Sequence, residues 1–233
     1  MSSYKGHSVF ALILSLMFFY NPLIIALTVI GANIPDFDHK LKKDNVYKMI
    51  ILGLIVFISL YILKLPYFVG LIIVFLGVTF YFSEHRSFTH SIFGILVLTS
   101  AVALILIWSY QILVNITILQ DNYLIMTILI ALLSFLFLNK KILPIFLIVL
   151  FLTVFIFPKN TISYIEIVFG LFLGLFSHIV LDASTPSGIK LFAPISSKKV
   201  YKNFSIASIF ILIILSIAVH IPALFRIFTA YLS

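Results

Sequence analysis

The sequence predicts an all-α membrane protein: a polytopic bundle of transmembrane helices that forms one integral membrane domain over residues 1–233. Two observations support this prediction. Hydrophobic residues make up 63% of the chain and charged residues only 9%, whereas a soluble domain is about half apolar and about a quarter charged. The apolar residues also fall into long runs, which are stable as helices in lipid. A water-soluble fold is therefore excluded.

Nine apolar runs are expected to form helices. A helix needs about 20 residues to cross the hydrocarbon core of a bilayer, so the shorter runs are marginal as spans. The connectors are compact, for example at residues 64–66 and 158–160, which favours one domain without a linker. The predicted helices cover residues 8–20, 23–34, 48–64, 67–82, 91–119, 123–138, 142–157, 161–182 and 204–228.

The first two runs leave two alternatives open. Asn21 and Pro22 lie between them, and proline removes a backbone donor and restricts the residue before it, so a turn is expected there. We expect a short N-terminal helical hairpin that enters the membrane and returns to the same face. The alternative is one kinked span over residues 8–34, which would place His7 on the opposite face from residue 36.

Charge and cysteine content restrict the function further. The formal net charge of +8 does not indicate a nucleic-acid partner, because the basic residues lie in short connectors between apolar runs. The chain has no cysteine, so any metal site must use histidine and carboxylate ligands. No small-residue cleavage site follows the first apolar run, and we expect no removable signal peptide.

Four of the six histidines and four acidic residues fall in three short segments, at residues 34–39, 84–90 and 178–182. In the last segment His178 and Asp182 are four residues apart on an apolar helix, so their side chains share one face. An imidazole and a carboxylate at this spacing can bind a divalent cation such as Zn²⁺. The alternative is a polar pair at the point where the helix leaves the membrane.

The segment at residues 34–39 carries two carboxylates, Asp36 and Asp38, and then His39. Two carboxylates so close repel each other unless a cation lies between them. The alternative is an ordinary polar turn after a membrane helix. The segment therefore predicts either some of the ligands of a metal site or only a polar turn at which the chain leaves the membrane.

In the segment at residues 84–90, His85 and His90 are five positions apart, about 140° around a helix, so one helix would not direct both to one point. We expect His85 in a loop and His90 in the first turn of the next helix, with Ser87 or Thr89 as its cap. The alternative is an interfacial loop in which Arg86 faces headgroups. His220 has no acidic neighbour and is expected to be structural.

Counting the predicted spans brings the polar segments together. Two spans separate His39 from His85 and four separate His90 from His178, so all three segments return to one membrane face. A hairpin would add His7 to that face. In this arrangement 12 of the 15 basic residues lie on the same side, and the positive-inside rule makes it the cytoplasmic face of the cell (inner) membrane.

Six short motifs occur in an order that is similar to one known family. They are Lys5-Gly6-His7, Pro35-Asp36-x-Asp38-His39, His85-Arg86-x-x-Thr89-His90-Ser91, the stretch from Gly174 through His178 to Asp182, Thr185-Pro186-Ser187-Gly188, and Leu191 to Pro194. Together they resemble the YdjM-like family of membrane-bound metal-dependent hydrolases. The family pattern also implies two short helices before the Pro-Asp turn, which favours the hairpin. An extra apolar pair near residues 123–157 departs from shorter members, but a pair of helices preserves sidedness.

The resemblance implies a polar metal-binding site built from His7, Asp36, Asp38, His39, His85, His90, His178 and Asp182. The His-x-x-x-Asp helix and the Asp/His-rich turns are also distantly similar to the zinc-dependent phospholipase C and single-strand nuclease group. That similarity implies phosphoester hydrolysis.

The leading hypothesis is a metal-dependent hydrolase that cleaves a phosphoester, of lipid-headgroup type, at the cytoplasmic membrane face. Its cofactor would be one or two divalent ions, expected to be Zn²⁺ and bridged, if two, by Asp36 or Asp38. Glu84 is expected to transfer protons, and Arg86, with Lys190, to neutralise phosphate charge. The alternatives are a divalent-cation transporter and a non-enzymatic membrane protein with a structural metal site.

Overall fold

The computed structural model describes residues 4–37, 43–83, 86–116, 121–157 and 162–232. Within these ranges the regular structure is helical, apart from one isolated antiparallel bridge between Ile189 and Val200, so the all-α prediction is confirmed. The helices are α1 (Tyr4–Leu16), α2 (Pro22–Gly31), α4 (Lys43–Ile62), α5 (Phe68–Phe82), α6 (Ile92–Ile116), α7 (Asn122–Phe137), α8 (Leu143–Ile156), α9 (Tyr164–Ala183) and α10 (Lys202–Leu232), with a 3₁₀ turn, η1 (Phe88–His90), before α6.

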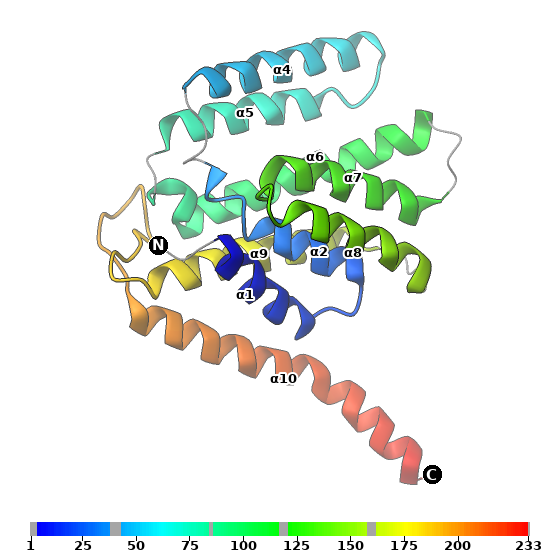
Figure 1. Ribbon diagram of the computed structural model, residues 1–233, viewed down its shortest axis with the longest axis vertical. Coiled ribbons are helices and arrows are strands. Elements are labelled where there is room, and N and C mark those ends of the chain that lie inside the picture. Colours follow the sequence, from blue (N-terminus) through cyan, green and yellow to red (C-terminus); the bar gives the residue numbers. More distant parts are fainter. Residues whose placement is uncertain (1–3, 38–42, 84–85, 117–120, 158–161, 233) are drawn as a thin grey trace.

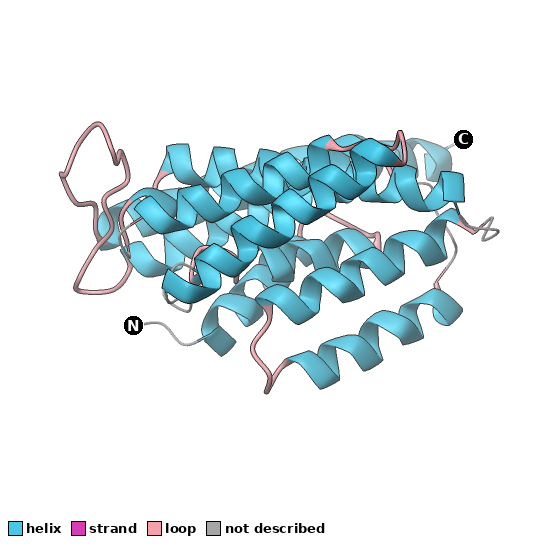
Figure 2. Cartoon of the chain, turned by 90° about the horizontal axis from the view of Figure 1, so that it is seen from above, coloured by secondary structure: helices cyan, strands magenta, loops and turns pink. Residues whose placement is uncertain are grey.

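Three of these helices are long and apolar enough to cross a membrane: Ile92–Ile116, Tyr164–Ala183 and the Lys202–Ile221 part of α10. The other apolar helical segments of the described chain, among them the Val46–Ile62 part of α4, are shorter. Figure 2 shows the long helices running in roughly similar directions, with the loop between α9 and α10 projecting at one end. Hydrophobic side chains such as Phe155 and Phe210 are exposed on the outside, as expected for surfaces that face lipid.

Helices α1 and α2 form a hairpin, which decides between the two alternatives for residues 8–34. The Asn21 side chain accepts a hydrogen bond from the Leu23 backbone N–H (3.0 Å), and Pro22 opens α2. Asparagine before a helix and proline in its first turn are favourable there. The chain therefore reverses at this turn, and α1 and α2 lie side by side (Figure 1). His7 and Asp36 consequently end on the same side.

Helix α1 begins four residues earlier than its predicted start at residue 8. His7 therefore lies inside the helix, on its buried face, next to Ser8. The Ser8 hydroxyl donates to the Tyr4 carbonyl (3.0 Å) and receives a hydrogen bond from the Asn33 side chain (3.0 Å). These polar contacts extend the buried face of α1 beyond its apolar run, which the pattern of apolar residues alone did not reveal.

The centre of the bundle is the crossing of α2 and α9. A Cβ atom added to Gly174 would lie 2.1 Å from the Thr28 carbonyl oxygen, and one added to Gly31 would lie 2.8 Å from the Leu171 carbonyl oxygen. Glycine at both positions therefore lets the two backbones approach closely, as small residues do between membrane helices. The crossing brings the C-terminal end of α2 against the part of α9 that carries His178.

The outer helices pack around this centre (Figure 1). Helices α4 and α5 form an antiparallel pair on one side of the bundle, where a Cβ atom at Gly70 would lie 2.3 Å from the backbone nitrogen of Phe57. Helix α10 lies on the opposite side, along α1 and α9. Helix α6 contacts α5, α7 and α9 and so connects the pair to the centre.

Candidate metal centre

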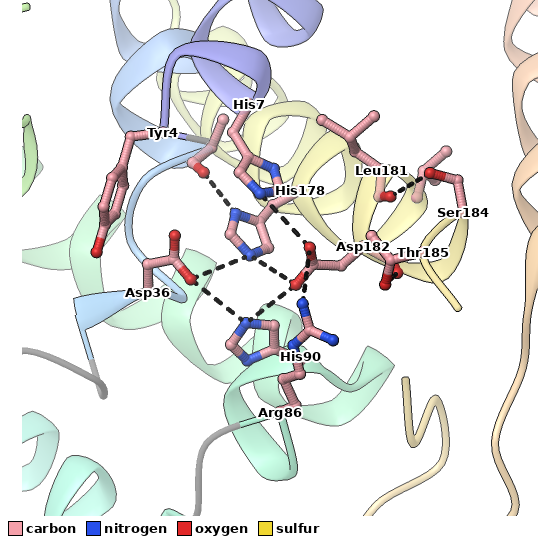
Figure 3. A network of polar contacts seen from close by, with 12 residues as sticks. Tyr4, His7, Asp36, Arg86, His90, His178, Leu181, Asp182, Ser184 and Thr185 are labelled. Atoms are coloured by element: carbon pink, nitrogen blue, oxygen red, sulfur yellow. Dashed lines mark hydrogen bonds and ion pairs between the residues drawn. The ribbon is translucent and has the colours of Figure 1, made fainter. Parts of the chain in front are cut away.

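Side chains from four separate parts of the chain meet at one end of the α2–α9 crossing (Figure 3). Helix α1 contributes one histidine, the turn after α2 contributes one aspartate, the segment between α5 and α6 contributes an arginine and a histidine, and α9 contributes a histidine and an aspartate. In that order they are His7, Asp36, Arg86, His90, His178 and Asp182.

Two imidazole nitrogens and two carboxylate oxygens form a closed ring of nearly equal distances. The Nε2 atom of His178 lies 3.7 Å from Asp36 Oδ1 and 3.6 Å from Asp182 Oδ2. The Nε2 atom of His90 lies 3.8 Å from Asp36 Oδ1 and 3.7 Å from Asp182 Oδ2. The four atoms thus converge on one point between them (Figure 3).

The ring distances fit a shared cation better than direct hydrogen bonds. An N–H···O hydrogen bond has a donor–acceptor distance of about 2.7–3.2 Å, and all four ring distances are longer. Two ligand atoms at about 2.0–2.1 Å from one tetrahedral zinc ion lie about 3.4 Å apart. The residues present therefore match the donor types and, closely, the spacing that a small divalent cation requires.

The orientation of His178 is set by the backbone of α2. Its Nδ1 atom donates to the Ala32 carbonyl oxygen over 2.7 Å, so in the neutral ring the Nε2 atom carries a lone pair. That Nε2 atom is fully buried and has no hydrogen-bond partner among the described residues. A lone pair facing two carboxylates is unfavourable without a positive charge between them, and a backbone carbonyl behind the ring is the usual support of a metal-binding histidine.

His90 lies in the single turn η1 rather than in the first turn of α6, which corrects the sequence-based prediction. Its Nδ1 atom lies 3.0 Å from the Thr89 hydroxyl, so Nε2 is the ring nitrogen that faces the carboxylates. The cap of α6 is neither Ser87 nor Thr89. Instead, the Ser91 hydroxyl accepts a hydrogen bond from the Gly94 backbone N–H (3.0 Å) and donates to the Phe88 carbonyl oxygen (2.7 Å).

The physical reason for this correction is the close fit between η1 and α6. A Cβ atom at Gly94 would lie 1.8 Å from the Phe88 carbonyl oxygen, so only glycine allows η1 to fold back on the helix. The cap is thereby displaced to Ser91. A serine three residues before Gly94 was the signal in the sequence that could have identified this cap.

The second oxygen of Asp182 faces a different pair of side chains. Oδ1 lies 3.5 Å from His7 Nε2 and 3.5 Å from an Arg86 guanidinium nitrogen. His7 also stacks on His178, with ring centroids 3.9 Å apart. Arg86 has a positive φ of 60°, and its guanidinium contacts the Ser187 hydroxyl. Asp182 therefore presents Oδ2 to the ring of four ligands and Oδ1 to His7 and Arg86.

The site is buried except at one edge. The side chains of His90, His178 and Asp182 are at most 3% exposed, whereas those of Asp36 and Arg86 are 14% and 16% exposed. Burial alone would raise the pKa of Asp36, but its polar contact with His90 and the positive charge of His178, His7 and His90 in their protonated forms lower it to about 2. The carboxylate form, which binds cations, is therefore favoured. Solvent reaches the site beside Asp36 and Arg86.

Four of the residues predicted for the site, Glu84, His85, Asp38 and His39, lie outside the described residues. The predicted residues His7, Asp36, Arg86, His90, His178 and Asp182 are brought together, and their roles stay predictions. Lys190 makes no contact with them that the structure describes. Glu166 is not part of the cluster: it accepts a hydrogen bond from the Ser163 backbone N–H (2.9 Å) and completes the capping box of α9.

These features define an α-helical integral membrane protein with a buried His/Asp cluster at the ends of its helices. The chain matches the family model described as YdjM inner membrane protein over residues 1–140 and 141–232, and it therefore belongs to the YdjM family of inner membrane proteins. The family predicted from the sequence motifs is confirmed. No curated protein and no solved structure matches the chain.

Proposed function

We propose that this protein is a membrane-embedded, metal-dependent hydrolase that cleaves a phosphoester of lipid-headgroup type at the cytoplasmic face of a membrane crossed several times by the chain. The observation that carries the proposal is the closed ring of two imidazole nitrogens and two carboxylate oxygens around one point. The buried Nε2 atom of His178 supports it, because its lone pair faces two carboxylates.

The described ligands support one ion. The residues His7, Asp36 and His178 form one group of potential ligands, and His90, His178 and Asp182 form another. Both groups need His178, whose single lone pair at Nε2 can bind only one cation. We infer that His178, His90, Asp36 and Asp182 hold this ion. The mixed nitrogen and oxygen set suits Zn²⁺.

Charge at the open edge favours an anionic substrate. The carboxylates of Asp36 and Asp182 balance the charge of a divalent ion, so the Arg86 guanidinium adds a net positive charge beside the opening. Arginine binds phosphate oxygens in a geometry that fits its two amino groups. In this proposal Arg86 moves from Asp182 toward the phosphate, and Ser187 holds the other side of its guanidinium.

For hydrolysis, Asp36, the ligand at the exposed edge, would have to give up its position to water. The bound Zn²⁺ would lower the pKa of that water from about 15.7 toward about 7. The residues of the chain orient and shield the reaction. His7 holds the outer oxygen of Asp182 when Arg86 turns to the phosphate, and the buried imidazoles exclude bulk water from all but the edge at Asp36. The proton-transfer role of Glu84 and the bridging role of Asp38 concern residues outside those described.

Metal analysis of protein purified in detergent tests the proposal directly. Wild-type protein is expected to contain about one zinc ion per chain, and Asp182→Asn and His178→Ala should lose it. Asp121→Asn is the matched control, because it removes a carboxylate charge far from the site while retaining an oxygen that can cap α7. Wild-type protein without bound metal, or equal metal content in Asp182→Asn, would refute the metal site.

Hydrolysis needs a separate measurement. Metal-loaded protein in vesicles should release the headgroup from at least one class in a panel of phosphomonoester and phosphodiester lipids, and Arg86→Gln should reduce the rate. Arg86→Lys retains the positive charge but cannot bind two phosphate oxygens in the bidentate geometry of arginine. It should therefore retain only part of the wild-type rate. Metal binding without turnover of any phosphoester would refute the enzymatic role.

A structural metal site is the second candidate, and one observation favours it. Four protein ligands can close a tetrahedral zinc site completely, as structural sites do, and three of the four side chains are at most 3% exposed. In that case chelation would lower the melting temperature and no lipid would be hydrolysed. A transporter is less favoured, because transport sites lie near the bilayer midplane at broken helices, whereas these residues lie at helix ends.

A further inference from the structure

The turn between α1 and α2 lies at the end of the hairpin away from the candidate metal centre, and Leu16 and Tyr20 beside it are exposed. The 13 residues of α1 extend about 20 Å at 1.5 Å per residue, so the turn is separated by that distance from the end that carries the site. The hydrocarbon core of a bilayer is about 30 Å thick. Non-helical backbone at this depth is tolerated only when its polar groups find partners within the protein.

Helix α10 supplies those partners to one backbone carbonyl of the turn. The Met17 carbonyl oxygen accepts hydrogen bonds from the Ser216 hydroxyl (2.9 Å) and from the His220 Nε2 atom (2.8 Å). Because a carbonyl only accepts, the proton of the neutral His220 ring is on Nε2. Its Nδ1 atom is then the acceptor for the Tyr20 hydroxyl at 3.3 Å. Both ring nitrogens of His220 are thus used to hold the turn.

The same face of α10 also binds α9 near the candidate metal centre. The Ser205 hydroxyl donates to the Val180 carbonyl oxygen (2.6 Å), and Val180 lies between the two site residues of α9. Between Ser205 and Ser216, Leu212 packs against Leu14 of α1 and Leu173 of α9. Helix α10 therefore binds α9 at the site end and the hairpin at its tip, as its course in Figure 1 shows.

We propose that Ser216 and His220 are positioning residues that fix the tip of the α1–α2 hairpin and so set its register against α9. A helix moves nearly as a rigid rod, so a displacement of the tip is transmitted to its other end. The end of α1 carries His7, whose ring is 3.9 Å from that of His178, and the end of α2 leads to Asp36. Ligand geometry is disturbed by shifts of about 0.5 Å.

Distance measurements between two labels test the positional part, which does not depend on the proposed function. The chain has no native cysteine, so Ile13→Cys on α1 and Phe169→Cys on α9, both exposed to lipid, give two unique sites for spin labels. Double electron–electron resonance should show a narrow distance distribution in the otherwise wild-type chain. The additional changes Ser216→Ala and His220→Ala together should shift or broaden it.

Two further variants separate positioning from general destabilisation. Ile217→Ala removes a lipid-exposed side chain next to Ser216 and should leave the distance distribution unchanged. His220→Gln retains a donor that can reach the Met17 carbonyl and should restore most of the narrow distribution. If the double variant does not yield folded protein, the single variants Ser216→Ala and His220→Ala decide. An unchanged distribution in the folded alanine variants would overturn the proposal.

The affinity for Zn²⁺ is a second readout, which would not change if Ser216 and His220 only stabilised the fold. This readout rests on the proposed function. At a temperature well below melting, His220→Ala should raise the Kd for Zn²⁺, because ligand geometry is disturbed by shifts of about 0.5 Å, and His220→Gln should restore it. An unchanged Kd would overturn the link between the turn and the site. Wild-type protein that binds no zinc would refute the proposed function, while the label distances would still test the positioning role of Ser216 and His220.

Discussion

His7 stacks on His178 with ring centroids 3.9 Å apart and an angle of 11° between the ring planes. The two residues are 171 positions apart in the chain, on α1 and α9. His178 belongs to the ring of four candidate ligands, whereas His7 faces the outer oxygen of Asp182 at 3.5 Å. In this arrangement His178 is a candidate ligand, whereas His7 supports the candidate ligand Asp182 from outside the ring.

His7→Phe should weaken zinc binding less than His178→Ala. Phenylalanine retains a ring for stacking but loses the contact with Asp182 Oδ1, and the loss of such an outer partner costs about 10–100-fold in metal affinity. His178→Ala removes a ligand and should abolish binding at micromolar zinc. Competition with a chromogenic chelator measures both Kd values. Equal effects of the two changes would show that His7 is itself a ligand.

Metal removal should lower the melting temperature of the wild-type protein. A ligand that binds only the folded state at a free concentration 100 times its Kd stabilises that state by about 2.7 kcal/mol. Without the ion, the carboxylates of Asp36 and Asp182 face each other across the ring, and their repulsion adds to the loss. Differential scanning fluorimetry in detergent, with and without a chelator, measures this change.

The chelator experiment has an internal control. Asp182→Asn should show the same melting temperature with and without chelator, because the site no longer binds the ion. Asp121→Asn should respond as wild type does. A chelator effect that persists in Asp182→Asn would place the stabilising ion elsewhere.

Gly174→Ala should destabilise the protein more than Gly170→Ala. The new methyl group at position 174 would meet the Thr28 backbone carbonyl at 2.1 Å, whereas at position 170 the nearest atom, at 2.8 Å, belongs to the Ile24 side chain. A side chain can move aside and a helix backbone cannot. Overpacking typically costs about 1–3 kcal/mol. Denaturant titration in mixed micelles should rank the variants in this order, and the reverse order would contradict the α2–α9 crossing.

Ser91→Ala should destabilise the protein by about 1 kcal/mol, the typical cost of losing a helix cap. Ser91 is the residue whose hydroxyl receives the Gly94 N–H at the start of α6. Ser87→Ala is the matched control and should have little effect, because the Ser87 side chain makes no capping hydrogen bond. Thermal unfolding of the two variants measures the difference. A larger loss in Ser87→Ala would restore the sequence-based assignment of the cap.

Much of the fold was predictable because it depends on local properties. Each predicted helix has a counterpart within a few residues, since the apolar runs and the turn at Asn21 and Pro22 are marked in the sequence itself. The spacing of four between His178 and Asp182 likewise implies a shared helix face. Helix bounds were less predictable where polar contacts extend a helix, as Ser8 and Asn33 do for α1.

Composition and helical periodicity are local properties, and they suffice to show that the protein is helical and apolar enough for a membrane and that its histidines and aspartates are concentrated in a few segments. Three relationships required the folded chain: the Ala32 carbonyl orients His178, the two oxygens of Asp182 face different partners, and His220 holds the turn at Met17. These relationships depend on the depth and rotation of one helix relative to another. Contacts between distant residues set those two quantities, and no local pattern encodes them.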